Sequence, residues 1–185
     1  IREFCLSRGL GDVYKRQVVL ASSIWINPVA KGVPEITKSE TMQQIRDLVK
    51  EDPKAIWLVV DMAYPATNIP AMAGADCLNT TQTYPQKTRW EMLDQEGECE
   101  DIYNRYCHIR ASLGSKTMLE LVSTDYVEVT LSPEDLKKLN IRYIVSTNDF
   151  DERIAAGTTN IFTDSGIEFQ KYYEGTQLSI YGCVY

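Results

Sequence analysis

The stretch Ala55-Ile-Trp-Leu-Val-Val-Asp61 decides the fold of this chain. A short, continuous apolar run that is rich in β-branched residues is typical of a strand buried on both faces of a sheet. The residues before it predict a helix, because the apolar side chains from Met42 to Val49 recur on one helical face. A helix followed by a doubly buried strand predicts the start of an α/β layer.

Sequence signals mark both ends of this helix. Thr37 and Glu40 have the spacing of a capping box, and Ser39 is a competing N-cap residue. Asp52-Pro53 ends the helix near Glu51, because proline cannot continue it. The boundaries therefore separate the helix from the strand by only a short turn.

The remaining pattern predicts further short elements. Helical turns are expected over 69–75, and amphipathic helices over 87–93, 98–106 and 133–139, the last capped by Ser132. Strands are expected over 118–122, 126–131 and 141–146, and a C-terminal hairpin from 169–173 and 178–184. The fold class is α/β, with α+β as the alternative: a single domain with a mixed β-sheet flanked by short helices.

The N-terminal segment differs from the rest. Residues 1–17, IREFCLSRGLGDVYKRQ, lack apolar periodicity and are net positive in an acidic chain. They resemble a translated adapter or contig end of a metagenomic assembly, so we expect a non-native segment, with a basic N-terminal arm as the alternative. Residues 18–26, VVLASSIWI, are fewer than the ~20 apolar residues that span a bilayer. They fit either the remnant of a transmembrane helix or a buried first strand, and 27–185 is expected to form the soluble domain of a fragment.

Composition excludes several function classes. A chain of 185 residues that is 44% hydrophobic and 24% charged suits one globular domain. Nineteen Lys and Arg against 26 Asp and Glu give a net charge of -7, which argues against a nucleic-acid partner. The single His disfavours His-rich metal sites and His-dependent catalysis. No phosphate-binding glycine motif occurs, so we expect no nucleotide site and no cofactor.

Cysteine spacing leaves two alternatives. Cys77, Cys99, Cys107 and Cys183 follow the first segment and contain no CxxC pair, so no metal site is expected. A disulfide between Cys77 and Cys99, or between Cys99 and Cys107, is one alternative in an oxidising compartment. Free buried thiols are the other.

The region 79–108 is dense in polar and aromatic residues. Aromatic rings stack on the apolar faces of sugars, and amide, guanidinium and imidazole groups form directional hydrogen bonds, so this region could bind sugar. The alternative is that the same side chains anchor an irregular loop. The candidate binding or loop-anchoring residues are Asn79, Gln82, Tyr84, Trp90, Asn104, Arg105, Tyr106 and His108. The acidic clusters at 98–101 and 149–152 are interpreted as solvated faces, and no catalytic residue is predicted.

Four segments carry a resemblance to a known group of proteins. They are INPVAKGVPEI at 26–36, IWLVVD at 56–61, LNTTQTYPQKTRWEMLD at 78–94 and IYNRYCHI at 102–109. The chain from Val18 to Tyr185 resembles the C-terminal soluble region of large bacterial polytopic membrane proteins that are similar to GT-C-type glycosyltransferases. The positions that fit are Tyr84, Pro85, Trp90, Leu93, Asp94, Asn104, Arg105, Tyr106 and His108. Cys107 departs from the small residue expected at its position.

The resemblance implies an extracytoplasmic domain attached to the cell membrane. In that family the catalytic acid lies in an early extracytoplasmic loop, so no catalytic residue is carried over to this chain. The implied role is binding of a glycan or lipid-linked sugar acceptor, or structural support, with the upstream transmembrane region as partner. The alternatives are a freestanding α/β sugar-binding protein or enzyme with its pocket in 79–108, and a purely structural interaction module.

Overall fold

The computed structural model describes residues 13–21, 37–147 and 149–185. The chain divides into two units, Ile1–Glu35 and Ile36–Tyr185. In the first unit, residues 13–21 form a helix whose side chains are exposed. Among the helices of the described residues, none combines the length and the apolar character needed to cross a membrane.

The helix over 13–21 crosses the predicted boundary at residue 18. Residues 18–21 are helical, which contradicts the strand alternative for these four positions. Residues 1–12 and 22–26 lie outside the described residues. The non-native origin of 1–17 and the transmembrane remnant at 18–26 therefore stay predictions.

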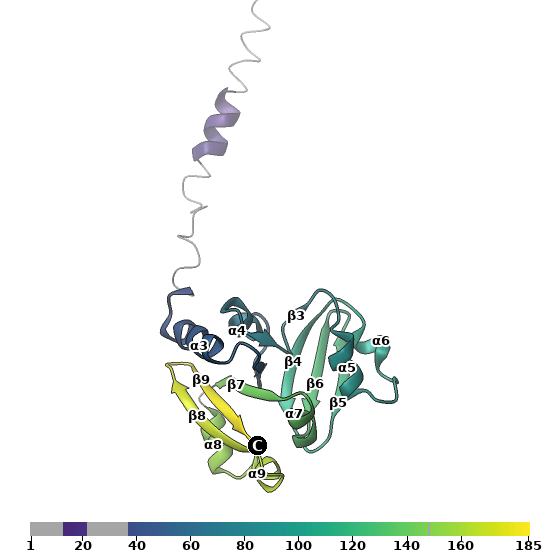
Figure 1. The fold of residues 1–185 in the computed structure, drawn as a ribbon. Helices are drawn as coiled ribbons and strands as arrows, with labels where there is room; N and C mark the ends of the chain where they lie inside the picture. The colour runs from purple at the N-terminus through teal and green to yellow at the C-terminus, as the bar shows by residue number, and fades with distance from the viewer. Residues whose placement is uncertain (1–12, 22–36, 148) are drawn as a thin grey trace, which may run out of the picture. The chain divides into compact units, whose positions relative to one another are not determined.

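The second unit contains a five-stranded mixed sheet (Figure 1). Its strands, in spatial order, are β2 (Asp76–Cys77), β1 (Ile56–Val59), β7 (Ile141–Thr147), β9 (Leu178–Val184) and β8 (Glu168–Glu174). β1 runs parallel to β2 and to β7, whereas β9 is antiparallel to β7 and β8. The β8–β9 pair is the hairpin that the alternating C-terminal pattern predicts.

A second mixed sheet has four strands. Their order is β3 (Thr81–Gln82), β4 (Cys107–Leu113), β6 (Tyr126–Leu131) and β5 (Met118–Ser123). β4 and β6 are parallel, and the two outer strands pair with them in antiparallel fashion. The predicted α/β class with mixed pairing and a C-terminal hairpin is confirmed. The strands are divided between two sheets, however, where the sequence pattern predicted one.

β1 has both faces in hydrophobic surroundings, as its sequence predicts. Leu58 and Val60 belong to one core, which includes strands β4 and β6. Trp57 and Val59 belong to a second core, which contains Ile45 of the preceding helix. All of these side chains are fully buried. Successive side chains of a strand point to opposite faces, so β1 separates the two cores.

The two sheets meet immediately after β1. The backbone N–H of Val60 donates to Val145 of β7 at 2.8 Å, and the next N–H, of Asp61, donates to Ala111 of β4 at 2.8 Å. Asp61 has φ 58°, the left-handed conformation that turns the chain. The carboxylate of Asp61 is paired with Arg153.

Short helices cover the sheets (Figure 1). α5 (Lys87–Leu93) and α6 (Glu100–Tyr103) lie beside the four-stranded sheet, and α8 (Asp149–Ala155) and α9 (Asn160–Asp164) lie beside the five-stranded sheet. The helices of this unit are α3 (Glu40–Glu51), the 3-10 turn η1 (Ala66–Asn68), α4 (Ile69–Met72), α5 (Lys87–Leu93), α6 (Glu100–Tyr103), α7 (Pro133–Lys138), α8 (Asp149–Ala155) and α9 (Asn160–Asp164).

Hydrogen bonds at the helix N-termini show which of the predicted capping residues are used. The Ser39 hydroxyl accepts a hydrogen bond from the Met42 N–H at 3.3 Å, so Ser39 is the N-cap of α3. α7 begins at a capping box, in which Ser132 and Asp135 each accept from the other's backbone N–H. The predicted cap at Ser132 is therefore confirmed.

Candidate ligand-binding pocket

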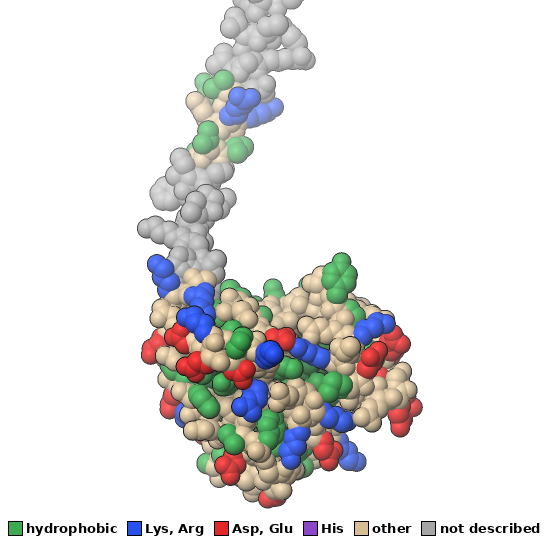
Figure 2. All heavy atoms as spheres, viewed as in Figure 1, with side chains coloured by type: hydrophobic (Ala, Val, Ile, Leu, Met, Phe, Trp, Pro, Cys, Tyr) green, Lys and Arg blue, Asp and Glu red, His purple; other side chains and the backbone are tan. Residues whose placement is uncertain are grey.

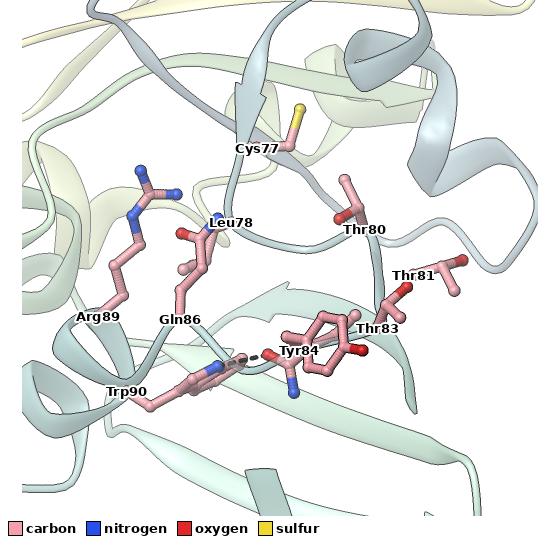
Figure 3. A pocket seen from close by; sticks show the side chains of 10 residues that line it. Cys77, Leu78, Thr80, Thr81, Thr83, Tyr84, Gln86, Arg89 and Trp90 are labelled. Atoms are coloured by element: carbon pink, nitrogen blue, oxygen red, sulfur yellow. Dashed lines mark hydrogen bonds between the residues drawn. The ribbon is translucent and has the colours of Figure 1, made fainter. Parts of the chain in front are cut away.

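A pocket of about 250 Å³ lies where the chain passes from β2 through β3 to α5 (Figure 3). Arg89, Gln86 and Trp90 stand on one side of it, and the threonines stand on the other (Figure 3). The lining residues are Cys77, Leu78, Thr80, Thr81, Gln82, Thr83, Tyr84, Gln86, Arg89 and Trp90. The pocket therefore falls within the predicted region 79–108 and extends slightly beyond its start.

The floor of the pocket is a buried hydrogen-bond network around Gln82. The indole Nε1–H of Trp90 donates to the Gln82 side-chain oxygen at 2.7 Å. The Gln82 amide nitrogen donates to the carbonyl oxygens of Tyr103 and Arg105, at 2.7 and 3.0 Å. The Trp90 ring also stacks on Tyr103, with 5.5 Å between ring centroids. Gln82 and Trp90 thus hold the pocket together, and their polar atoms are already bonded.

Asn79 is a structural residue. It is fully buried, and its side-chain oxygen accepts from the Val59 N–H at 2.9 Å while its amide nitrogen donates to the Val59 carbonyl at 2.6 Å. The Asn79 amide therefore replaces the backbone of a neighbouring strand at the end of β1. This pairing leaves it outside the ligand-binding surface.

The single charged side chain in the pocket lining is neutralised by its partner. The Arg89 guanidinium binds both carboxylate oxygens of Asp76, and one of these hydrogen bonds is 3.0 Å long. Only 17% of the Arg89 side chain is exposed. Bidentate pairing of this kind fixes the geometry as well as the charge. The lining consequently has no unpaired formal charge.

Several polar groups at the pocket remain available for a ligand. The side chains of Thr80, Thr83, Tyr84 and Gln86 form no hydrogen bond within the described part of the chain, although each lines the pocket. Tyr84 is 85% exposed, far more than a tyrosine that contributes to packing. Hydroxyl and amide groups both donate and accept hydrogen bonds. The rim can therefore bind a ligand that carries several hydroxyl groups.

An aromatic cluster adjoins the pocket on the outer face of β3 and β4. The His108 ring lies against Tyr64, with 4.2 Å between centroids, and against the edge of Tyr106, at 5.6 Å. Tyr64 is 52% exposed and Tyr106 is 50% exposed. We call these three residues, Tyr64, Tyr106 and His108, the aromatic platform.

Hydrogen bonds orient His108 within the platform. The Asn68 amide nitrogen donates to the Thr81 hydroxyl at 3.0 Å, and this hydroxyl lies 3.0 Å from His108 Nδ1. A hydroxyl has one hydrogen and two lone pairs, so Thr81 can accept from Asn68 and also bond Nδ1, which orients the imidazole ring. Thr81 lines the pocket as well, so it joins the pocket to the aromatic platform.

Asn104 and Arg105 anchor the loop after α6. Arg105 Nε donates to the Asp101 carbonyl at 3.0 Å, and a second guanidinium nitrogen binds the same oxygen. The Asn104 amide donates to Glu100 at 3.3 Å. These bonds fit the loop-anchoring alternative for both residues.

The structure thus divides the eight predicted residues into three groups. Gln82, Tyr84 and Trp90 line the pocket, and Tyr106 and His108 belong to the platform; Asn79, Asn104 and Arg105 are structural. Sequence reasoning missed Tyr64 and Asn68, which come from the connection after β1 and carry no local signal. It also singled out none of the threonines at 80, 81 and 83, although the polar run that contains them was recognised.

The cysteines do not form the proposed disulfides. Cys77, Cys99, Cys107 and Cys183 are free thiols, and all except Cys99 are buried. Burial raises the pKa of Cys77 and of Cys183 to about 12 and also raises the pKa of Cys107. Because the thiolate is the nucleophile, the raised pKa disfavours the reactive form of the Cys77 thiol in the pocket wall at neutral pH. The buried-thiol alternative describes the structure.

The described residues contain no group of three or more His, Cys, Asp or Glu side chains arranged to hold a metal ion.

The fold and the pocket define a two-sheet α/β domain with a small, uncharged, hydroxyl-rich pocket. The matching family model is described as "Domain of unknown function (DUF7654)" and covers residues 35–185, so the chain belongs to this family. Comparison with curated proteins and with solved structures finds no match.

Two tryptophans that are fully buried in the described part of the chain, Trp57 and Trp90, provide a test of the Gln82 network. Trp57 Nε1 is buried with no hydrogen-bond partner in the described residues, whereas Trp90 Nε1 is bonded to Gln82. Both Trp→Phe variants lose packing, but only Trp90→Phe leaves a buried acceptor unpaired, which costs about 1–3 kcal/mol. We expect Trp90→Phe to lower the free energy of unfolding by about 1–2 kcal/mol more than Trp57→Phe. Urea denaturation measures both, and equal losses would contradict the role given to this bond.

Alkylation tests the state of the cysteines. With iodoacetamide at pH 8 and peptide mapping of the folded chain, we expect modification of half-buried Cys99 and protection of Cys77, Cys107 and Cys183. Because the pKa of Cys77 is raised to about 12, its protection should persist when the pH is raised to about 10. In urea without reductant all four should react. A cysteine that resists alkylation there would reveal a disulfide.

Proposed function

We propose that this domain binds a neutral glycan in the pocket beside β3, as a non-catalytic accessory domain of a membrane-embedded glycosyltransferase-like protein. The observation that carries the proposal is the set of polar side chains without internal partners at the rim: Thr80, Thr83, Tyr84 and Gln86.

The chemistry of the rim matches a sugar better than other small ligands. A sugar ring offers alternating hydroxyl groups, which pair with groups that both donate and accept. It also has apolar C–H faces, for which the exposed Tyr84 ring is a stacking surface. Since Arg89 is already paired with Asp76, the pocket favours a neutral sugar over an acidic one.

The size of the pocket limits the ligand. Pockets that enclose drug-sized molecules measure roughly 300–1,000 Å³, and this one measures about 250 Å³. The volume suits a single sugar ring and is too small for a dinucleotide or similar cofactor. We therefore assign the pocket to one unit of a glycan.

A purely structural module is the second candidate, and one observation favours it. Internal hydrogen bonds already engage the side chains of three predicted binding residues, Asn79, Gln82 and Arg105. On the face drawn in Figure 2, however, hydrophobic side chains are scattered among charged ones of both signs and do not gather into one patch. That face offers little continuous apolar area for docking to another protein.

Support for the membrane placement is separate from the pocket. It rests on the resemblance of 18–185 to the soluble end of GT-C-like membrane proteins and on the apolar run over 18–26. In such a protein the domain would lie on the extracytoplasmic side of the cell membrane and present a glycan or lipid-linked acceptor to the catalytic part. Glycan binding does not depend on this placement.

A glycan array tests the proposed binding. We expect the full 185-residue chain to retain neutral oligosaccharides, and Tyr84→Ala together with Thr83→Ala to weaken retention about thirtyfold, since a stacking contact and a hydrogen bond are each worth about 1 kcal/mol. Both side chains are exposed, so the variant should remain folded.

The matched control is Tyr172→Ala in β8 of the other sheet, where the tyrosine is 50% exposed. Retention by this variant should equal that of the unmodified chain. If the unmodified chain retains no glycan, the structural module becomes the better function.

The membrane placement is tested by the coding sequence upstream of the codon for Val18. We expect it to encode several apolar segments of about 20 residues, each long enough to span a bilayer as a helix. Sequencing of the genomic locus or the transcript measures this directly. A complete gene that encodes a lone α/β protein would instead support a freestanding sugar-binding protein or enzyme.

A further inference from the structure

We infer that the bound glycan has at least two sugar units, one in the pocket and the next stacked on the aromatic platform of Tyr64, Tyr106 and His108. This inference rests on the proposed function and specifies the length of its ligand.

The pocket and the aromatic platform share one residue, Thr81. Thr81 lines the pocket, and its hydroxyl lies 3.0 Å from His108 Nδ1. Thr81 is also directly paired with His108 in the β3–β4 ladder. β3 is an edge strand, and Thr81 is the residue of this strand that belongs to the pocket lining and contacts the platform.

The two tyrosine rings of the platform are partly open to solvent. About half of Tyr64 and half of Tyr106 are open to solvent, and both contact the His108 ring between them. Aromatic residues that only fill space are normally covered. The Tyr64 and Tyr106 rings are inclined to the His108 ring by 34° and 75°, so each half-open tyrosine offers a separate apolar surface on which a sugar ring can stack.

His108 also has an oriented polar ring atom without a partner. The chain of bonds from Asn68 through Thr81 ends at His108 Nδ1 and orients the ring. No hydrogen bond to Nε2 occurs within the described residues. A stacked sugar can therefore form a directional hydrogen bond with Nε2 beside its apolar contact, which distinguishes it from a purely hydrophobic ligand.

The charged side chains beside the platform are paired, as in the pocket, which favours a neutral ligand. Arg110 follows His108 on the same face of β4, and its guanidinium lies 3.7 Å from the Glu128 carboxylate of β6. This pairing offsets the charge of Arg110, the cationic side chain that shares this face of β4 with His108. Both parts of the site thus suit one continuous neutral oligosaccharide.

The experiment compares chain lengths. Malto-, cello- and chito-oligosaccharides of one to four units are titrated into the full 185-residue chain and followed by calorimetry. For the series that binds, we expect the disaccharide or trisaccharide to bind about fivefold to tenfold more tightly than the monosaccharide, as one added stacking contact allows. Tyr64→Ala and Tyr106→Ala should each reduce this gain and leave monosaccharide binding unchanged.

The controls separate this inference from the proposed function. Tyr84→Ala should weaken monosaccharides and oligosaccharides equally, and Tyr172→Ala should change neither. Thermal unfolding of each variant verifies that it is folded, and Tyr106→Ala provides a second test if Tyr64→Ala is not. Equal affinity for one and several units would overturn the inference and leave the proposed function standing. No binding by any of the three series would overturn both.

Discussion

The double burial of β1 is the constraint on which the rest of the structure depends. Its side chains alternate between two cores, Leu58 and Val60 in one, Trp57 and Val59 in the other. At its end, consecutive backbone N–H groups donate to different sheets, first to β7 and then to β4. Any shift of β1 by one residue would exchange the side chains of the two cores. The register of one short strand therefore fixes the position of both sheets.

The pocket follows from this arrangement. Because β2 belongs to one sheet and β3 to the other, the chain between them must cross from sheet to sheet, and the pocket forms along that crossing. The Gln82 amide then bonds Trp90 of α5, the last carbonyl of α6 and a carbonyl of the loop that follows. One buried side chain thus fixes the pocket floor, while the threonines and Tyr84 at the rim keep their polar groups for another molecule.

The sequence was informative wherever a local signal existed. The doubly buried strand, the cap at Ser132 and the alternating hairpin at the C-terminus rest on hydrophobic period and capping chemistry, which act within a few residues. β4 was missed because Cys107–Leu113 mixes small, polar and charged residues, and its burial depends on partners far along the chain. The polar region 79–108 was recognised from composition alone. The composition does not show which of its side chains face inward, since Gln82 and Thr81 are both polar and the pairing of β3 with β4 decides which of them is buried. Tyr64 and Asn68 reach the platform only through the tertiary fold.

The amide of Asn79 has a further consequence for the molecule in solution. It occupies both the N–H and the carbonyl of Val59 on the side where β2 has ended. Exposed strand edges with free backbone groups recruit strands from other molecules and promote aggregation. Here a side chain closes the end of β1 in place of a strand, so Val59 offers no free backbone group to another molecule even though the neighbouring β2 is only two residues long.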